Sequence, residues 1–501
     1  MKTKQLLALF LALIMIMTAL VSCNGESKDT ETTPPSVEDT DAPASDSEPA
    51  ETEIMDDLGD VNFANVTNPI VTFFVRTGYE SEVWVEELTD DPVNDASYWR
   101  TQAVQERLGV TVNQINQSGA YSAREEWNAT LRNAVQTETH DFDAAMFYAA
   151  TASPLAIEGC YLNLLDQDML SLQKPWWNQS ITKEATVYGS LFFASGSIAL
   201  SQLKVANVLF YNKDIYDEHF SSSGRKNIYQ VVRDGEWTID YLHDLTASVW
   251  IDADSNGEPS SGDTVGWGGS AGSAAGQMDS WVYALGCDIT KIDESIGEPV
   301  LTYYNEHSVK AHDRLIKFYK ENTGAFVKNV QTKDVGESTF INGKVMMQLA
   351  TFNAGGTYNE ADFRYGVLPL PKYDLAQEKY RSISEVTSSM VAMLTTVEDE
   401  RADMIAATIE LTAAEAYKQV KPVYVEVILK SQNANAPDDA EMVDLILDSM
   451  VYSFGWVFMT KIGKAFRIVD GSVDLTQDYE SNKDQYKALL DTYLDGYASV
   501  V

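Results

Sequence analysis

The sequence predicts an α/β protein built from two lobes. Short apolar segments typical of buried strands alternate with segments of helical periodicity, and this alternation indicates mostly parallel sheets flanked by helices. The chain has 501 residues, whereas a single hydrophobic core rarely serves more than about 250 to 300 residues. Long amphipathic helices follow the last strand pattern. We therefore expect two α/β lobes completed by C-terminal helices.

The N-terminus has the pattern of an export signal. Lys2 and Lys4 precede an unbroken apolar run over residues 6–20, which is too short for a bilayer core that needs roughly 20 apolar residues. The run closes with Leu-Val-Ser-Cys at Cys23, which resembles the lipobox of bacterial lipoproteins. We expect a signal peptide over residues 1–22, lipidation of Cys23, and a mature protein anchored to the outer face of the cell membrane.

An acidic, polar segment follows the anchor. Residues 24–60 are rich in Ser, Thr, Pro, Asp and Glu and hold a single basic residue, Lys28. Such a composition buries too little apolar surface to offset the entropy of ordering the chain. We expect residues 23–67 to form a disordered tether that holds the folded part away from the membrane.

Charge and cysteine content exclude several classes of function. The formal net charge of −39 opposes binding to nucleic acid, whose partners are usually basic. Cys160 and Cys287 are the only cysteines beyond Cys23, too few for a disulfide framework and without the paired spacing of a zinc site. We expect both to be small buried residues.

The folded part can be divided into elements by apolar patterning. Strands are expected at residues 69–75, 110–115, 142–148, 208–211, 345–349 and 390–394. Helices are expected at residues 97–108, 123–135, 239–249, 278–285, 309–319, 398–418, 440–450 and 483–497. The helix at 239–249 has the firmest start, because Thr238 is a good N-cap and Asp240 suits the first turn.

Four segments, in this order, carry a resemblance to a known family. They are Phe210-Tyr-Asn-Lys-Asp214, Gly235-Glu-Trp-Thr238, Phe340-Ile-Asn-Gly-Lys344 with Met346 and Met347 following, and Gly366-Val-Leu-Pro-Leu-Pro371. Behind a lipobox and a tether, they resemble the family 1 extracellular solute-binding proteins, the maltose-binding-protein-like sugar receptors of ABC importers. The resemblance covers roughly residues 68–497.

The resemblance implies a periplasmic-binding-protein-like type II fold with hinge crossovers. Lobe 1 would take residues 68–200 and 375–430, and lobe 2 residues 201–374 and 431–501, with crossings near 196–205 and 372–385. It also implies a monomer that captures a sugar or oligosaccharide between the lobes and delivers it to the permease subunits of an ABC importer. Ligand contacts to both lobes would shift the population toward a closed state.

Candidate ligand contacts are aromatic and polar residues placed after strands, because sugars present apolar faces together with hydroxyl groups. The candidates are Arg76, Tyr79, Tyr148, Trp267, Gln277, Trp281 and Phe352. Trp267 and Trp281 flank a Gly- and Ser-rich loop. In the family, the loop after the strand at 345–349 commonly carries a sugar-stacking aromatic, which points to Phe352. We expect the paired Trp176 and Trp177 to pin a loop onto the core and leave them outside the site.

A possible calcium loop follows the helix at 239–249. Oxygen-bearing residues stand at the spacing of an EF-hand loop, with a glycine at its turn position: Asp252, Asp254, Asn256, Gly257, Ser260 and Asp263. Asp263 is shorter than the usual bidentate Glu, and Pro259 interrupts the loop. A structural Ca²⁺ and a solvated acidic turn without metal both remain open, and no cofactor is required.

Other functions with the same composition remain open. A secreted glycan-active enzyme would need two carboxylates facing each other across a cleft, and the 75 acidic residues do not exclude such a pair. Motifs of serine hydrolases, zinc proteases and phosphate-binding loops are absent from the sequence, so we expect no enzyme. A peptide receptor of the same fold and a surface glycan sensor without transport are the remaining alternatives.

Overall fold

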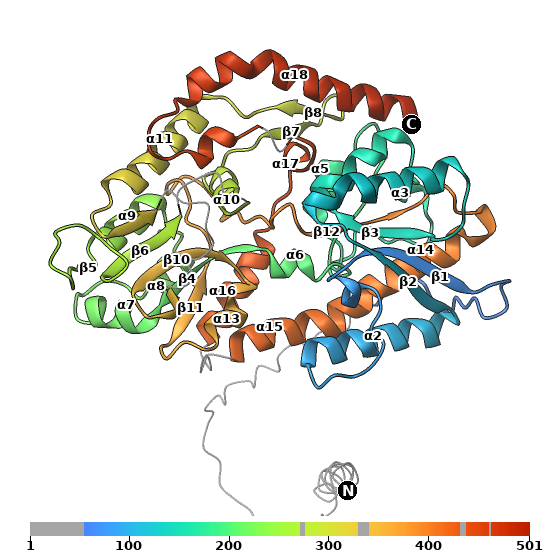
Figure 1. Cartoon of the computed structure of the whole chain (residues 1–501), viewed down its shortest axis with the longest axis horizontal. Coiled ribbons are helices and arrows are strands. Elements are labelled where there is room, and N and C mark those ends of the chain that lie inside the picture. Colours follow the sequence, from blue (N-terminus) through green and yellow to red (C-terminus); the bar gives the residue numbers. More distant parts are fainter. Residues whose placement is uncertain (1–54, 271–275, 329–339, 431–436, 460–461) are drawn as a thin grey trace, which may run out of the picture. The chain divides into compact units, whose positions relative to one another are not determined.

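The computed structural model describes residues 55–270, 276–328, 340–430, 437–459 and 462–501. The predicted signal peptide, Cys23 and the tether as far as residue 54 lie outside the described residues. None of the helices in the described ranges is both long and apolar enough to cross a membrane. Residues 55–501 form one compact unit, shown in Figure 1.

Lobe 1 is built on a four-stranded sheet of order β12-β3-β1-β2. Its strands are β1 (Ile70–Arg76), β2 (Thr111–Gln117), β3 (Ala144–Tyr148) and β12 (Ser389–Met393). The first three strands run parallel, and β12 is antiparallel to β3. Its helices are α2 (Pro92–Leu108), α3 (Arg124–Gln136), α4 (Ala149–Ala152), α5 (Gln179–Ala185) and α14 (Asp399–Glu415). The ring of Phe74 stacks between Trp127 and Phe142 in the core.

Lobe 2 is built on a six-stranded sheet of order β11-β4-β10-β6-β5, with β9 paired to β6. Its strands are β4 (Asn207–Asn212), β5 (Trp250–Ile251), β6 (Thr264–Ser270), β9 (Ala325–Lys328), β10 (Val345–Thr351) and β11 (Tyr365–Leu368). Strands β6, β9 and β10 are parallel. A separate hairpin joins β7 (Thr290–Asp293) to β8 (Glu298–Leu301).

The helices of lobe 2 surround this sheet (Figure 1). They are α7 (Lys213–Phe220), α8 (Ile228–Arg233), α9 (Ile239–Ala247), α10 (Gly276–Ala284), α11 (Glu306–Glu321) and α13 (Ala354–Tyr358). The Thr238 side chain accepts a hydrogen bond from the Tyr241 backbone N–H, which confirms the predicted N-cap. In lobe 1, Gly109 ends α2 with φ of 66°, a left-handed conformation that glycine adopts readily.

Within the described residues, three segments that pass between the lobes lie side by side. The first crossing comprises α6 (Ser201–Lys204) and residues 205–207, the second residues 382–385, and the third residues 449–451. Between the first and second crossings, the backbone N–H of Asn207 donates to the carbonyl of Ile383. The backbone N–H of Glu385 donates to the carbonyl of Val205. Between the second and third crossings, the backbone N–H of Val451 donates to the carbonyl of Ser382. The second crossing falls within its predicted range of 372–385, the first runs two residues beyond its predicted range of 196–205, and the third was not predicted.

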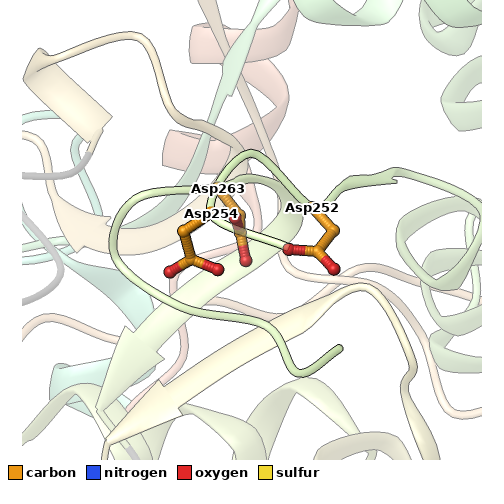
Figure 2. Close-up of side chains that lie close together, drawn as sticks. All are labelled: Asp252, Asp254 and Asp263. Atoms are coloured by element: carbon orange, nitrogen blue, oxygen red, sulfur yellow. The ribbon is translucent and has the colours of Figure 1, made fainter. Parts of the chain in front are cut away.

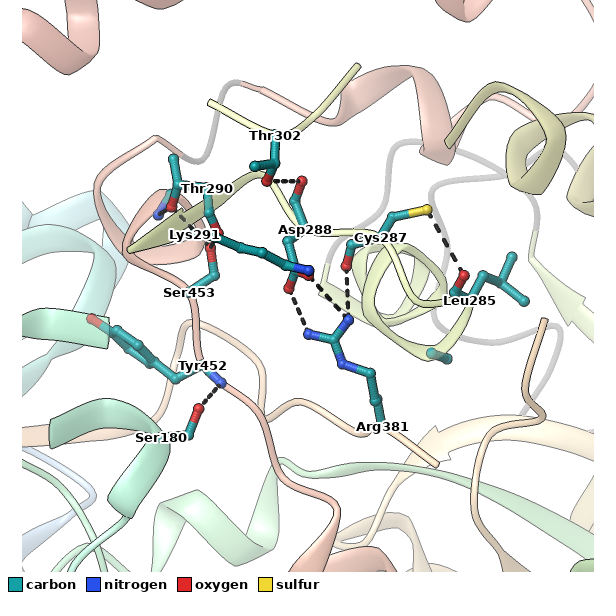
Figure 3. A network of polar contacts seen from close by, with 12 residues as sticks. Ser180, Leu285, Cys287, Asp288, Thr290, Lys291, Thr302, Arg381, Tyr452 and Ser453 are labelled. Carbon is teal, nitrogen blue, oxygen red and sulfur yellow. Dashed lines mark hydrogen bonds and ion pairs between the residues drawn. The ribbon is translucent and has the colours of Figure 1, made fainter. Parts of the chain in front are cut away.

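Buried polar groups join the second and third crossings to both lobes (Figure 3). Arg381 donates to both carboxylate oxygens of Asp288, at 2.5 and 3.2 Å. The Tyr452 backbone N–H donates to the Ser180 hydroxyl of α5 at 2.7 Å. One step along the chain, Ser453 hydrogen bonds to Thr290 of β7. The junction is therefore held by specific polar contacts as well as by packing.

The C-terminal helices contact both lobes. Helix α14 continues through a π-helical segment (Ala416–Val420) into α15 (Lys421–Lys430), which packs against both α2 and α16. The remaining helices are α16 (Pro437–Asp448), α17 (Phe454–Phe458) and α18 (Leu475–Val500). Both α17 and α18 touch the 3₁₀ segment Ser153–Glu158 of lobe 1 and the β7-β8 hairpin. The segment 431–501, which we assigned to lobe 2, therefore packs against lobe 1 as well.

The start of the folded part lies earlier than predicted. Asp56 is 8% exposed and forms an ion pair with Arg107 of α2 at 2.7 Å. Leu58 belongs to the hydrophobic core, and Asp57 pairs with Lys174. Residues 55–67 are therefore packed onto lobe 1, which corrects the predicted tether boundary. Composition misled the prediction here, because the acidic residues are matched by basic residues distant in sequence.

The paired tryptophans are structural, as expected. Trp176 and Trp177 are 1% and 2% exposed. Their indole N–H groups donate to the two carboxylate oxygens of Glu410 in α14, at 2.9 and 2.8 Å. Burial raises the pKa of Glu410, although these hydrogen bonds oppose the shift. The two rings and this carboxylate fix the loop at residues 175–177 onto lobe 1.

Candidate functional site

Both sheets direct the carboxyl ends of their parallel strands toward the first crossing. After β10, the backbone N–H groups of Phe352 and Asn353 donate to the carbonyls of Ala206 and Lys204. In lobe 1, the Ser389 N–H at the start of β12 donates to the Ser201 hydroxyl at 2.9 Å. Ligand sites in open α/β sheets form at such strand ends. This junction is therefore the candidate site.

Arg76, Tyr79 and Tyr148 come together at this edge of lobe 1. Arg76 ends β1 and is 3% exposed, and its Nη2 donates to the Ser389 hydroxyl at 2.7 Å. Its guanidinium carbon lies 3.7 Å from the ring centroid of Tyr79 and 5.5 Å from that of Tyr148. Three of the predicted contact residues are thus brought into one cluster by two neighbouring strands.

The electrostatics of this cluster reflect burial. Burial lowers the pKa of Arg76, and the negative charge of Glu82 opposes this shift. Arg76 Nε has no hydrogen-bond partner among the described residues. Burial also raises the pKa of Tyr148 to about 12, so this phenol remains a hydrogen-bond donor at neutral pH. The cluster combines a fixed cation, two aromatic rings and a neutral hydroxyl.

Polar groups of the first crossing extend the cluster. The Gln202 side-chain amide donates to the Ser388 hydroxyl at 2.9 Å, and the Ser201 N–H donates to Glu82 at 2.7 Å. A hollow of about 270 Å³ adjoins this region and is bordered by both lobe 1 and the C-terminal helices. Its lining includes Trp177, Gln202, Lys421 and Asp448. Hydrogen-bonding side chains therefore lie close to the points where the chain changes lobe.

The structure places the lobe 2 candidates differently. Trp267 of β6 and Trp281 of α10 are 1% and 0% exposed, and both pack against Phe318 with ring centroids 5.0 and 5.8 Å away. Phe352 is 1% exposed within a second apolar cluster. We therefore reassign these three rings to the core. Gln277 in α10 is half-buried, and the neighbouring residues 271–275 lie outside the described residues.

Tyr121 is a candidate that the sequence analysis missed. It follows β2, as Tyr79 follows β1, and 62% of it is exposed. The predicted strand stopped at residue 115, whereas β2 extends to Gln117. Because the last part of β2 is polar, its apolar pattern ended early and hid the aromatic residue beyond it. The rule that located Tyr79 would have located Tyr121 with the correct strand end.

The acidic loop of lobe 2 gathers three carboxylates (Figure 2). Oxygens of Asp252, Asp254 and Asp263 lie within 4.8 Å of one another. The Asn256 N–H donates to both Asp252 and Asp254, and φ at Gly257 is 79°. Burial raises the pKa of Asp263, but hydrogen bonds from backbone and indole N–H groups outweigh it and leave the pKa lowered. These oxygen donors fit a hard cation such as Ca²⁺.

The cysteines are free and buried. Cys160 and Cys287 form no disulfide, which confirms the prediction of small core residues. Burial raises the pKa of their thiols to about 11 and about 12. Neither thiol is a nucleophile at neutral pH, because the thiolate is the reactive form.

Comparisons with known proteins identify the architecture. No protein-family model and no curated protein matches the sequence. Solved structures do match over nearly their whole length. A cyclo/maltodextrin-binding protein complexed with maltotetraose gives a TM-score of 0.54 at 13% identity, covering 85% of this chain and 98% of that chain. The chain has the two-lobed periplasmic-binding-protein-like fold.

Two further structures share this fold. UspC from Mycobacterium tuberculosis gives a TM-score of 0.55 at 15% identity, covering 84% of this chain and 99% of its own. An ABC substrate-binding protein from Listeria monocytogenes in complex with cycloalternan gives 0.52 at 14% identity, with the same coverage. The predicted fold class is confirmed, and its solved neighbours include sugar-binding proteins of ABC transporters.

Proposed function

We propose that this protein is a lipid-anchored, extracytoplasmic solute-binding protein that captures a sugar or oligosaccharide for an ABC importer. The convergence of strand ends from both sheets on the first crossing is the observation that carries the proposal. We propose that a ligand at this junction contacts both lobes, so that its binding favours the closed arrangement. The sugar-bound neighbours of the same fold support this ligand class.

The lobe 1 cluster supplies the chemistry that a sugar needs. The rings of Tyr79 and Tyr148 can cover the apolar faces of a pyranose, while Arg76 and Gln202 can hydrogen bond to its hydroxyl groups. Among these groups only the arginine is charged, which suits binding and release without chemistry. We accordingly propose a receptor that leaves its ligand unchanged.

A thermal-shift screen tests the proposed function. Residues 24–501, without the export segment, are heated with mono- and oligosaccharides, peptides and calcium, because a ligand that binds only the folded state raises the melting temperature. We expect a saturable shift with at least one sugar, which product analysis recovers intact. Shifts with peptides alone would indicate a peptide receptor, and a cleaved sugar would indicate an enzyme. No shift with any ligand would favour a non-transport role.

Membrane anchoring and delivery are tested separately. We propose that Cys23 carries the lipid, that residues 24–54 hold the folded unit off the membrane, and that the monomer docks on the permease subunits. Labelled fatty acid should be incorporated into the full chain and not into the Cys23→Ser variant, which should be released into the medium. Retention of that variant on the membrane would contradict the anchor.

We also propose that the loop at residues 252–263 binds a structural Ca²⁺. The three clustered carboxylates carry this proposal. The side-chain oxygens of Asn256 and Ser260 belong to the same loop, where Ser260 Oγ donates to Asp254 at 3.1 Å. The ion would offset the repulsion between the carboxylates and stiffen the loop. The ligand site does not depend on it, since no residue of this loop belongs to the lobe 1 cluster.

A further inference from the structure

Two tyrosines at the edge of lobe 1 are each covered on one face by an arginine. The guanidinium carbon of Arg76 lies 3.7 Å from the ring centroid of Tyr79, and that of Arg124 lies 4.3 Å from the ring centroid of Tyr121. Arg124 also donates to the Tyr121 carbonyl at 2.8 Å, so both the ring and the backbone of Tyr121 contact this arginine. Each ring is therefore fixed from one side by a cation–π contact.

The two arginine-backed rings follow neighbouring strands. Strands β1 and β2 pair in parallel with Arg76 opposite Gln117, and the Thr77 N–H continues the ladder to the Gln117 carbonyl. Neighbouring strands lie about 4.8 Å apart, so residues shortly after their ends share one edge. Tyr79 and Tyr121 thus follow the ends of two paired strands at the same edge of the lobe 1 sheet.

Gly119 makes room for this arrangement. A Cβ atom at this position would lie 2.4 Å from Cγ and 2.8 Å from Cδ of Arg76. Any other residue here would displace the arginine stem and with it the contact to Tyr79. Gly119, which lies between Tyr79 and Tyr121 in the sequence, therefore allows the aliphatic part of Arg76 to lie against the backbone after β2.

We infer that Tyr79 and Tyr121 form one two-ring platform that binds two neighbouring sugar units, so that the ligand is an oligosaccharide rather than a monosaccharide. The inference rests on the proposed function and deepens it. Arg76 and Arg124 are positioning residues, because they hold the ring planes before the ligand arrives. Pre-ordered rings lower the entropy cost of binding. Gly119 leaves the room that the Arg76 stem needs behind Tyr79.

Affinity measured against chain length tests the inference. Residues 24–501 are titrated calorimetrically with three series: glucose, maltose and maltotriose; glucose, cellobiose and cellotriose; and xylose, xylobiose and xylotriose. In the series that binds, the disaccharide should bind about tenfold or more tightly than the monosaccharide, since a further stacked ring contributes about 1.4 kcal/mol, which is a factor of ten. Equal affinity for monosaccharide and disaccharide would overturn the inference and leave the proposed function standing.

Variants separate the platform from general stability. Tyr121→Ala should weaken disaccharide binding about tenfold, while Tyr121→Phe keeps the ring and should bind the disaccharide about as tightly as the parent. Gly119→Ala should weaken both ligands, because it displaces the arginine behind Tyr79. Gly356→Ala is its matched control, since a Cβ at Gly356 meets nothing within 4 Å.

The outcomes distinguish the two levels of the argument. Unchanged disaccharide affinity in Tyr121→Ala would overturn the platform, even if the parent prefers longer sugars. Weaker binding in Tyr121→Phe as well as in Tyr121→Ala would assign the effect to the hydroxyl and also count against stacking. Failure of the parent to bind any member of the three series, with binding of peptides instead, would reject the proposed function itself.

Discussion

Replacing Glu410 by Gln tests how lobe 1 holds its paired tryptophans. The carboxylate is fully buried and accepts three hydrogen bonds, from the indoles of Trp176 and Trp177 and from the Ser171 backbone N–H. A glutamine of the same shape keeps one oxygen and presents an NH₂ group in place of the other. Whichever way the amide turns, that NH₂ faces an N–H donor.

The expected loss of stability follows from these contacts. A hydrogen bond to a charged group contributes about 1.5–3 kcal/mol, and an unsatisfied buried donor costs about 1–3 kcal/mol. The glutamine is cheaper to bury than the carboxylate, which offsets part of this cost. We expect the free energy of unfolding of Glu410→Gln to fall by about 2 kcal/mol.

Urea denaturation of residues 55–501, followed by tryptophan fluorescence, measures this change. The midpoint should fall while the slope stays constant. Trp177→Phe should lower the midpoint as well, and the double variant should lose less than the sum of the two, because both remove the same contact. Glu400→Gln, an exposed residue of the same helix, is the control and should leave the midpoint nearly unchanged. Sugar affinity should be unaffected in Glu410→Gln and Glu400→Gln, because neither residue lines the hollow beside the candidate site.

The pH dependence has a definite sign. The pKa of Glu410 is raised in the folded protein, so its protonated form is favoured by folding. This preference stabilises the folded protein fully at pH values below the pKa of Glu410 in the unfolded chain. The stabilisation is lost as the pH rises through the pKa of Glu410 in the folded protein. The stability difference between parent and Glu410→Gln should therefore shrink from pH 4 to pH 7. A difference that grows over this range, or a variant as stable as the parent, would refute this account of the tryptophan anchor.

Three further predictions concern the junction, the acidic loop and the cysteines. Asp288→Asn should lower the free energy of unfolding by about 2 kcal/mol, because it leaves Arg381 without its buried partner; an unchanged urea midpoint would contradict the role of this pair. Calcium should raise the melting temperature of the parent and chelator should reverse this, whereas Asp254→Asn should respond to neither; equal responses in both proteins would reject the calcium loop. Cys160 and Cys287 should resist a maleimide reagent at pH 7.5 in the folded protein and react in urea, which mass spectrometry would show; rapid labelling of the folded protein would contradict their burial.

The fold could be predicted where local patterns and physical requirements agree. Apolar runs located β1, β3, β4, β10 and β12 to within a few residues, because each is buried on both faces. The cap at Thr238 was correct since it depends on adjacent residues alone. The third crossing at residues 449–451 was missed, because nothing in its local sequence shows that it pairs with residues distant along the chain.

The candidate site was only partly predictable for a related reason. Placement after a strand identifies Arg76, Tyr79 and Tyr148, which the structure brings together. Trp267 and Trp281 were selected because they flank a Gly- and Ser-rich loop, although packing against Phe318 places both rings in the core. The end of an apolar strand can be read from sequence, whereas the polar end of β2 and burial by a distant helix cannot. Contacts that depend on tertiary packing therefore remained beyond the sequence.

The central claim is that a sugar is captured between two lobes that close around it. Small-angle X-ray scattering of residues 24–501, titrated with the oligosaccharide that gives the largest thermal shift, measures this closure directly. The account predicts a saturable decrease in the radius of gyration that follows the binding curve, with the sugar recovered intact. A sugar that binds without changing the radius of gyration, or one that is cleaved during the titration, would contradict it.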